Sequence, residues 1–231
     1  MSTQTGCGAA GPGDDAVTVL AASSLRTVFE DMAHRFDGRL RFSFAASSRL
    51  VTQVEHGATA DVVATADEAS MRPLSRAGLL ADASVPFATN GLAIAVAKGN
   101  PLGVRGIADL SRPGLVVVLA APEVPAGRYA GEALRRAGVV VRPASLEDDA
   151  SAVAARVERG EADAGLTYLT EVRGRTGLDA VALPEVADVR ATYVIAVLRA
   201  SRHPVAARRF VELVRSDPGR GLLAEAGFGP P

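Results

Sequence analysis

Two pairs of serines stand where a strand is expected to give way to a helix. Ser23-Ser24 and Ser47-Ser48 each follow an Ala-Ala step that closes an apolar run. A helix that begins at such a pair directs free backbone N–H groups, hydroxyl groups and the positive end of its dipole toward one point. This arrangement can bind an anion without a formal positive charge. Because a serine at a helix start is most often only an N-cap, that structural interpretation stands beside the functional one.

Three further segments carry groups that suit the same chemistry. The segment 124–127 (VPAG) leads into a predicted helix, so the N–H groups near Ala126 point outward. Asp148-Asp149 opens the next helix and leaves the N–H of Ala150 available. Tyr168 ends an apolar run. Its hydroxyl contacts a ligand in the functional interpretation; in the structural one, Tyr168 is a half-buried strand residue whose hydroxyl meets water or backbone. Ligands of open α/β sheets lie at the carboxyl ends of the strands, which favours one shared site.

The elements that would position these groups alternate along the chain. Short β runs and amphipathic helical patterns follow one another from Ala16, which predicts an α/β architecture with mostly parallel strands. Asp67 is placed to cap a helix, and Pro204 suits the first turn of a late one. Thr89-Asn90-Gly91 is turn-rich and is interpreted as the first crossover between two lobes. A last helical turn is expected to end at Gly227-Phe228. The predicted strands span residues 17–22, 40–44, 61–66, 92–97, 115–120, 164–169, 180–183 and 193–198.

The composition excludes several classes of function. Of 231 residues, 48% are hydrophobic and 22% charged, which suits a packed core. The 25 Lys and Arg residues against 26 Asp and Glu residues give a net charge of −1, which argues against nucleic acid or an anionic membrane as the main partner. One Cys and three widely separated His residues form no CxxC or HExxH metal site. No apolar run reaches the length of a membrane span.

An enzyme and a transcription regulator are the rival interpretations. A serine hydrolase acting through Ser24 or Ser47 would need a GxSxG elbow and a histidine nearby in the sequence, and the chain has neither. A glycine-rich phosphate loop is also absent. The effector domain of a regulator needs a helix-turn-helix, which residues 1–15 cannot form. We therefore expect a binding protein with no catalytic residue, no cofactor and no bound metal cation.

Residues 1–15 are small, polar and Gly-rich, and we expect them to be a disordered leader or tether. Thr5-Gly6-Cys7 looks like the end of a bacterial lipoprotein signal, in which a Cys after small residues carries lipid. Gln4 departs from the branched apolar residue usual at that position, and the leader lacks an apolar signal stretch. Cys7 is therefore either a lipid anchor or an exposed thiol in a loose tail.

Taken together, the segments resemble the molybdate-binding proteins that supply ABC importers, within the class of two-lobed periplasmic binding proteins. The resemblance implies a type II periplasmic-binding-protein-like α/β fold, each lobe a mixed, mostly parallel sheet flanked by helices. The first lobe would comprise residues 16–89 and 195–231 and the second residues 90–194, with the ligand in the cleft between them. The resemblance covers residues 17–228 and is carried by VTVLAASSL (17–25), FAASSRLVTQVEHGATADVVATAD (44–67), PEVPAGRYAGEALRRAG (122–138), VERGEADAGLTY (157–168) and Gly227-Phe228.

Transferred to the matching positions, the resemblance implies an oxyanion site made of neutral donors. The family often has a larger aliphatic residue where Ala150 stands and Glu-Asp where this chain has Asp148-Asp149. Arg128, beside the site, is expected to be a solvated side chain rather than a direct contact. The implied donors are the hydroxyl and N–H groups of Ser24 and Ser47, the N–H groups of Ala126 and Ala150, and the hydroxyl of Tyr168.

The function that the resemblance implies is capture of molybdate, and of tungstate, for the membrane permease of an ABC transporter. A carrier of sulfate or another tetrahedral oxyanion is the alternative. The protein would act as a monomer in the periplasm or on the outer face of the cytoplasmic membrane. Because the donors are divided between the lobes, we expect binding to close them about crossovers near residues 89–91 and 190–194.

Overall fold

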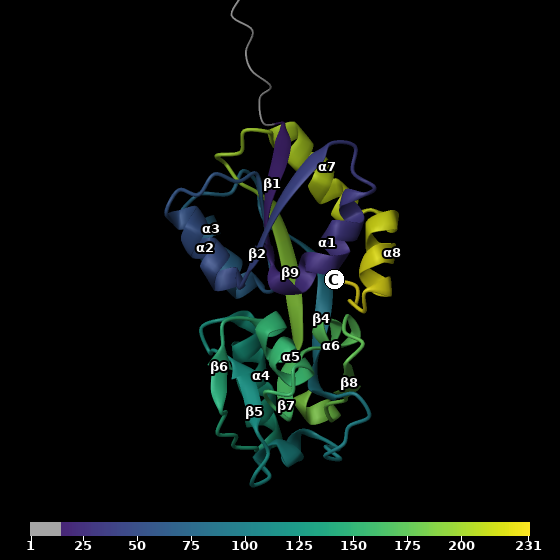
Figure 1. Cartoon of the computed structure of the whole chain (residues 1–231). Coiled ribbons are helices and arrows are strands. Elements are labelled where there is room, and N and C mark those ends of the chain that lie inside the picture. The colour runs from purple at the N-terminus through teal and green to yellow at the C-terminus, as the bar shows by residue number, and fades with distance from the viewer. Residues whose placement is uncertain (1–14) are drawn as a thin grey trace, which may run out of the picture.

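A computed structural model describes residues 15–231. The expected leader, with Cys7, lies outside this range apart from Asp15. The chain forms two lobes, one above the other in Figure 1, and two strands, β4 (Val85–Ala97) and β9 (Arg190–Val197), run between them. Strands and helices alternate in both lobes. The expected α/β class and two-lobed architecture are therefore confirmed.

The first lobe is built on three parallel strands. The central strand β1 (Ala16–Ala22) pairs in parallel with β2 (Arg39–Ala45) on one side and with β3 (Val62–Thr65) on the other. Antiparallel pairing of β3 with β9 joins this group to the connecting strands. The helices of the lobe are the short 3-10 helix η1 (Ser23–Leu25), α1 (Arg26–Ala33), α2 (Ser47–Glu55), α3 (Glu68–Arg76), α7 (Pro204–Arg215) and α8 (Asp217–Glu225).

The second lobe repeats this plan with different partners. Its central strand β5 (Val117–Ala120) pairs in parallel with β6 (Ser145–Glu147) and β7 (Ala164–Tyr168). Both β7 and β8 (Leu178–Val181) pair antiparallel with β4. The helices of the lobe are α4 (Pro125–Ala137), α5 (Ala150–Glu158), α6 (Leu169–Arg173) and the 3-10 helices η2 (Ile107–Ser111) and η3 (Glu185–Ala187).

One strand path crosses both lobes, in the order β2-β1-β3-β9-β4-β7-β5-β6. Strand β4 pairs with β9 as far as Gly91 and with β7 from Leu92 onward. The interpretation of Thr89-Asn90-Gly91 as a turn-rich break is therefore wrong, because these residues lie inside a continuous strand. Thr89 exchanges backbone hydrogen bonds of 2.9 and 2.8 Å with Gly229 near the C-terminus. A pattern of neighbouring residues cannot predict so distant a partner.

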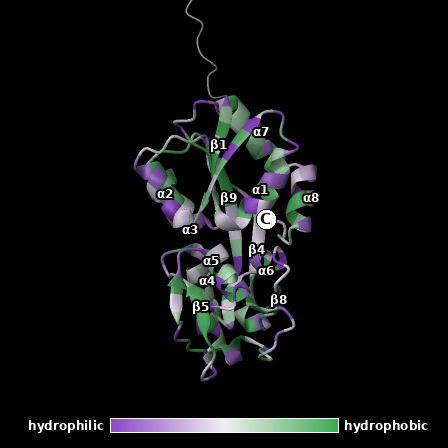
Figure 2. Cartoon of the chain, viewed as in Figure 1, coloured by the Kyte–Doolittle hydropathy of each residue, from purple (hydrophilic) through white to green (hydrophobic). Residues whose placement is uncertain are grey.

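Apolar side chains fill the space between the sheet and the helices of each lobe, and Figure 2 shows the hydrophobic residues concentrated along the strands. In the first lobe the core includes a cluster of phenylalanines: the rings of Phe29 and Phe210 meet edge to face with centroids 5.4 Å apart. Asp67 caps α3 as predicted, since its Oδ1 accepts a hydrogen bond of 2.8 Å from the N–H of Ser70. This contact starts α3 beside the cleft.

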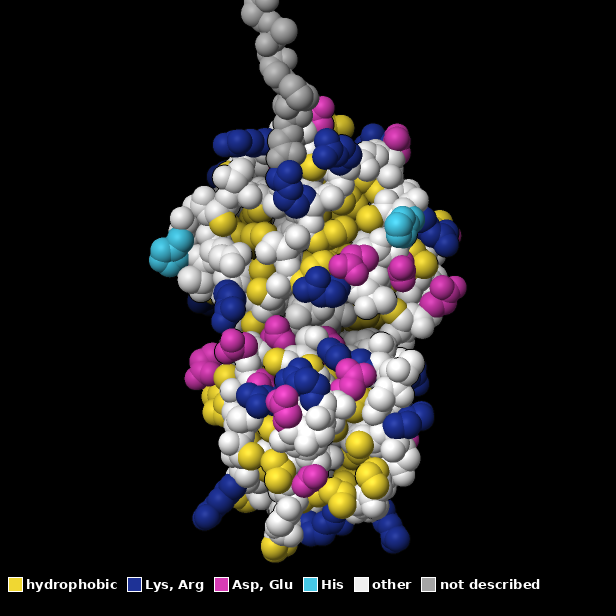
Figure 3. All heavy atoms as spheres, viewed as in Figure 1, with side chains coloured by type: hydrophobic (Ala, Val, Ile, Leu, Met, Phe, Trp, Pro, Cys, Tyr) yellow, Lys and Arg dark blue, Asp and Glu magenta, His cyan; other side chains and the backbone are white. Residues whose placement is uncertain are grey.

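Within residues 15–231, no helix is long and apolar enough to cross a membrane. The same residues contain no group of three or more His, Cys, Asp or Glu side chains placed to hold a metal ion. Figure 3 shows a waist between the lobes, and basic and acidic side chains are intermixed on the face drawn there.

Candidate functional site

All five predicted site residues line one small cavity between the lobes. Its volume is about 20 Å³, a little more than the space that one water molecule needs. Alanines at the ends of β1, β2 and β3 leave the space open because their side chains are short. The lining residues are Ala22, Ser23, Ser24, Ala45, Ala46, Ser47, Ala66, Val124, Pro125, Ala126, Asp149, Ala150 and Tyr168.

The two serines of the first lobe do not cap their helices. The N-cap positions are Ala22 for η1 and Ala46 for α2, and among the described residues no side chain makes a cap hydrogen bond at either start. The capping interpretation is therefore wrong at both positions. The Oγ of Ser47 accepts a hydrogen bond of 2.9 Å from the N–H of Ala66. Since that bond uses an oxygen lone pair, the hydroxyl proton of Ser47 is left to donate into the cavity.

Helix α4 brings the N–H of Ala126 to the cavity from the second lobe. Pro125 occupies the first helical position and has no N–H, so Ala126 carries the first one that the helix can offer. The helical ladder begins with the N–H of Arg128, which donates to the carbonyl of Val124 at 3.1 Å. Gly127 permits this placement: a Cβ there would lie 2.0 Å from the carbonyl oxygen of Ala121, so any other residue would push α4 away from β5.

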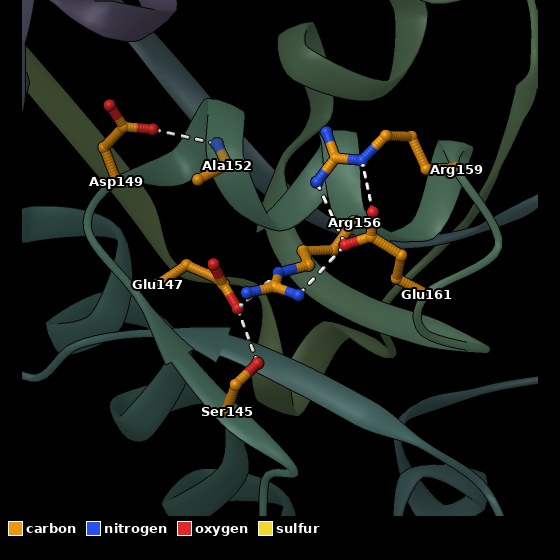
Figure 4. A network of polar contacts seen from close by, with 7 residues as sticks. All are labelled: Ser145, Glu147, Asp149, Ala152, Arg156, Arg159 and Glu161. Atoms are coloured by element: carbon orange, nitrogen blue, oxygen red, sulfur yellow. Dashed lines mark hydrogen bonds and ion pairs between the residues drawn. The ribbon is translucent and has the colours of Figure 1, made fainter.

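Helix α5 brings Ala150 to the cavity as its first residue. Asp149 is the N-cap, and its Oδ1 accepts a hydrogen bond of 2.9 Å from the N–H of Ala152 (Figure 4). The carbonyl of Ala150 accepts a hydrogen bond of 2.9 Å from the hydroxyl of Thr167 on β7. Farther along the helix, Arg156 bridges Glu147 on β6 at 3.2 Å and Glu161 at 2.9 Å, so both ends of α5 are tied down (Figure 4).

Tyr168, the last residue of β7, is 2% exposed and not half-buried as its structural interpretation assumed. Its hydroxyl oxygen is fully buried and has no hydrogen-bond partner in residues 15–231. Burial raises the pKa of this hydroxyl well above its ordinary value, so Tyr168 keeps its proton. An unpartnered buried donor is rare in folded proteins, and here it faces a cavity in which an anion oxygen would accept from it.

The side chain of Arg128 is exposed, as expected, with 38% of its surface accessible, but its guanidinium is also paired. Its guanidinium donates to Asp67 Oδ2 at 2.5 Å, to Ser70 Oγ at 3.2 Å and to the carbonyl of Glu123 at 2.9 Å. Arg128 belongs to α4 of the second lobe, whereas Asp67 and Ser70 belong to the first. The contact therefore joins the lobes beside the cavity, and Asp67, predicted only as a cap, has a second role that its sequence position did not signal.

Two buried polar residues behind the cavity were missed in the sequence. Tyr193 on β9 places its hydroxyl 2.8 Å from Ser24 Oγ. The side-chain nitrogen of Asn90 on β4 donates to the same hydroxyl at 3.3 Å and to Thr170 Oγ1 at 2.8 Å. The available signal was weak: an Asn beside Gly is typical of a turn, and a Tyr in an apolar run is typical of a core.

A larger cavity of about 430 Å³ lies beside η1, α6 and α8. It borders Glu171, which is 9% exposed and whose Oε1 has no partner within the described part of the chain. Burial, opposed by Arg175, raises the pKa of Glu171 from its ordinary 4.5 to about 7. No set of helix starts converges on this cavity as on the small one, so the small cavity is the candidate ligand site.

The donors around the small cavity are neutral O–H and N–H groups, and they come from both lobes. Such groups can form charge-assisted hydrogen bonds to an anion that has several oxygens. Burying a dianion is costly, so several donors must converge on it at once. Among the described residues no Arg or Lys lines the small cavity, and the guanidinium of Arg128 is paired with Asp67. The arrangement therefore suits a small oxyanion held by geometry rather than by a salt bridge.

The chain is similar to known proteins over nearly its whole length. Residues 17–229 match the family described as bacterial extracellular solute-binding protein. The molybdate-binding protein ModA of Mycobacterium tuberculosis (strain H37Rv) is 41% identical over 230 residues, covering 96% of this chain and 88% of ModA.

Two solved structures share the fold. The periplasmic molybdate-binding protein of Azotobacter vinelandii superposes with a TM-score of 0.81 at 17% identity, over 93% of this chain and 99% of that one. The sulfate-binding protein SubI of Mycobacterium tuberculosis H37Rv superposes with a TM-score of 0.80 at 21% identity, over 94% of this chain and 87% of SubI. Since proteins described as binding different oxyanions share it, the fold alone does not choose the ion.

Proposed function

Because the chain belongs to the bacterial extracellular solute-binding protein family, we propose that it captures molybdate outside the cytoplasmic membrane and delivers it to an ABC importer. Tungstate, an ion of the same shape and charge, would be bound with similar strength. The chain is a solute-binding protein and not an enzyme, so its site must hold the ion reversibly and release it unchanged.

The observation that carries the proposal is the buried, unpartnered hydroxyl of Tyr168 in a cavity that Ser24, Ser47 and the first residues of α4 and α5 also line. We propose that the ion accepts hydrogen bonds from the hydroxyl and N–H groups of Ser24 and Ser47, from the N–H groups of Ala126 and Ala150, and from Tyr168. A rigid cage of this kind favours the longer metal–oxygen bonds of molybdate and tungstate over the smaller sulfate. The identity with ModA of Mycobacterium tuberculosis supports the same choice.

We further propose that residues 16–89 with 195–231, and residues 90–194, act as the two lobes that close on the ion. Each supplies part of the cage, so neither alone can satisfy a dianion. The protein would act as a monomer and offer its closed shape to the permease. Cys7, outside the described residues, is proposed as the lipid attachment point that holds the protein at the membrane; intact mass measurement of membrane-extracted protein tests this.

Calorimetric titration of ligand-free protein with molybdate, tungstate, sulfate and phosphate tests the proposed function. We expect molybdate and tungstate to bind with similar dissociation constants and sulfate at least about a hundredfold more weakly, roughly 2.7 kcal/mol of discrimination. Sulfate binding within tenfold of molybdate would favour the alternative, a general carrier of tetrahedral oxyanions. No binding of any of the four ions would refute the oxyanion site altogether.

A further inference from the structure

We propose that Asn90 and Tyr193 fix the direction of the Ser24 hydroxyl, so that Ser24 donates to the bound oxyanion and offers no acceptor to an oxyanion that carries a proton of its own. This inference rests on the proposed function and adds to it. Neither residue borders the small cavity. Both would therefore be positioning residues, acting on the ion through Ser24.

The three side chains form a buried chain of hydrogen bonds that ends at the cavity. Asn90 and Tyr193 are buried, and they sit on neighbouring strands where β4 and β9 pair. The Asn90 nitrogen donates to Thr170 Oγ1 at 2.8 Å and to Tyr193 Oη at 3.3 Å. The distance from Tyr193 Oη to Ser24 Oγ is 2.8 Å. The chain therefore connects α6 of the second lobe, the two connecting strands and the first helix start.

The direction of each bond follows from what each group can do. An amide NH₂ can only donate, so Tyr193 accepts from Asn90. A phenol has a single proton, and burial raises the pKa of Tyr193, so that proton stays on the hydroxyl and points to Ser24 Oγ. Ser24 accepts it with a lone pair, and its own proton is then directed into the cavity. Asn90 thus determines, through Tyr193, that the Ser24 hydroxyl donates into the cavity rather than accepts from it.

The other hydroxyl and N–H groups also donate into the cavity, each for its own reason. The Ser47 hydroxyl accepts from the N–H of Ala66, and backbone N–H groups can only donate. If Tyr168 accepted a hydrogen bond from the ion, its own proton would be buried without an acceptor. Hydrogenphosphate and hydrogenarsenate each carry an O–H that needs an acceptor, and none of these hydroxyl and N–H groups supplies one. The Asp149 carboxylate also lines the cavity, where one of its oxygens caps α5, and it is unchanged in the variants below. Molybdate, tungstate and sulfate carry no proton and meet no such penalty.

Sulfate and phosphate at about pH 8 provide the sharp comparison, because both are then dianions of similar size and only phosphate keeps a proton. Their affinities are measured by competition against molybdate. In Asn90→Asp the carboxylate can only accept, so the Tyr193 hydroxyl donates its proton to residue 90. Ser24 then donates to Tyr193, and a lone pair of the Ser24 oxygen faces the cavity instead of the proton. We expect the sulfate-to-phosphate affinity ratio to fall by about tenfold or more, the worth of one hydrogen bond to a charged group.

Two further variants separate the effect of the Asn90–Tyr193–Ser24 hydrogen-bond chain from the general effect of an added negative charge. Asn100→Asp changes the other asparagine of the chain, in a loop away from the site, and should leave the ratio at the wild-type value. Tyr193→Phe releases the Ser24 hydroxyl to turn either way and should lower the ratio severalfold. Adding Asn90→Asp to Tyr193→Phe should then change the ratio little, because the relay to Ser24 is already cut.

The outcomes are distinguishable. An unchanged ratio in Asn90→Asp and in Tyr193→Phe, with molybdate still bound, overturns the inference and leaves the proposed function standing. A ratio that falls equally in Asn90→Asp with and without Tyr193 also overturns it, since the effect would then not pass through the relay. If Asn90→Asp does not fold, the ratio in Tyr193→Phe decides. Wild-type protein that binds no molybdate refutes the proposed function, and the inference fails with it.

Discussion

The Tyr168 hydroxyl is in an unfavourable environment unless a ligand pairs with it. It is fully buried, keeps its proton and has no acceptor in residues 15–231. Leaving such a group unpaired costs about 1–3 kcal/mol. An anion that supplies the acceptor removes this cost and adds a charge-assisted bond, so the same side chain weakens the empty closed form and strengthens the loaded one.

Tyr168→Phe tests that dual role. We expect molybdate affinity to fall by roughly ten- to a hundredfold, because a hydrogen bond to a charged group is worth about 1.5–3 kcal/mol. The melting temperature of the ligand-free variant should be unchanged or higher, since no orphaned hydroxyl remains. Titration calorimetry and thermal unfolding measure the two effects. Tyr129→Phe, which removes a hydroxyl outside the small cavity, is the matched control. Unaltered affinity in Tyr168→Phe would return that residue to a purely structural role.

Glu171 makes the stability of the protein depend on pH. Its pKa is about 7 in the folded chain, because burial outweighs the attraction of Arg175, against an ordinary 4.5. The folded state therefore binds the proton more tightly than the unfolded state, and stability falls as pH rises from about 4.5 through 7. The loss is roughly 3 kcal/mol at pH above both values.

Glu171→Gln removes this titration and should abolish that part of the pH dependence. Urea unfolding of wild type and variant at about pH 5 and pH 8 measures it. We expect the variant to be more stable than wild type at pH 8 and to lose most of that advantage at pH 5. An equal difference in stability at the two pH values would contradict the raised pKa.

At the scale of elements, α4 and α5 present their first N–H groups by different means. Helix α4 begins with a proline and depends on Gly127 to approach β5 closely, whereas α5 begins with an acidic side-chain cap. The Asp149 cap stabilises the start of α5, but it also places a carboxylate on the lining of an anion cavity. Helix stability and anion binding therefore make opposite demands on this residue.

Substitutions at Asp149 separate the two demands. Asn caps helices about as well as Asp, so Asp149→Asn should leave stability nearly unchanged and, with one negative charge fewer beside the ion, bind molybdate severalfold more tightly. Asp149→Ala loses the cap and should cost about 1 kcal/mol of stability. Chemical denaturation and calorimetry on the same preparations give both quantities. Weaker molybdate binding by Asp149→Asn would show that the cap geometry matters more than the charge.

Local signals predicted most of the elements and the composition of the candidate site. The alternation of strand and helix, the Asp67 cap, and the left-handed Gly138 that ends α4 with φ 67° are properties of short stretches of chain. They can therefore be recognised from sequence. The placement of Ser24, Ser47, Ala126, Ala150 and Tyr168 at one cavity followed from the resemblance to a family, and the structure brings all five together.

What was missed depends on distant partners. Strand β4 runs through Asn90-Gly91 because β9 and Gly229 pair with it, although both residue types favour turns. Strand β6 was not predicted, and α8 was expected only as a last turn. Ser24 and Ser47 do not cap their helices, because Tyr193 and Ala66 engage their hydroxyls from elsewhere in the fold. Such contacts join residues far apart in the sequence, which no local pattern records.

At the scale of the whole molecule, the ion pairs Arg128–Asp67 and Arg49–Asp148, both within residues 15–231, join the two lobes. Arg128 meets Asp67, whose side chain is 4% exposed, at 2.5 Å. Arg49 of α2 meets Asp148 at 3.3 Å, and both of these side chains are largely exposed. Exposed pairs contribute little because water screens them, so the pair at Asp67 should be the one that favours the closed arrangement.

Arg128→Gln should shift the balance toward an open form. We expect molybdate affinity to fall severalfold and the radius of gyration from small-angle scattering, at subsaturating molybdate, to increase. Arg49→Gln, the matched control, should change the affinity by less than about twofold and leave the radius of gyration at the wild-type value. Wild-type protein should become more compact when saturated with molybdate. Identical scattering profiles with and without the ion would mean that the site is preformed and that closure plays no part in binding.

The route of β9 constrains the order in which the chain can fold. Strand β3 ends at Thr65, yet its antiparallel partner begins at Arg190 and is made more than a hundred residues later. Until then β3 has an exposed edge, and unpaired edges invite association with other chains. The parallel group β5, β6 and β7 can assemble on β4 before β9 exists, whereas the lobe that starts first is completed last. Of the two lobes, the N-terminal one is therefore the more vulnerable to aggregation in a newly made chain.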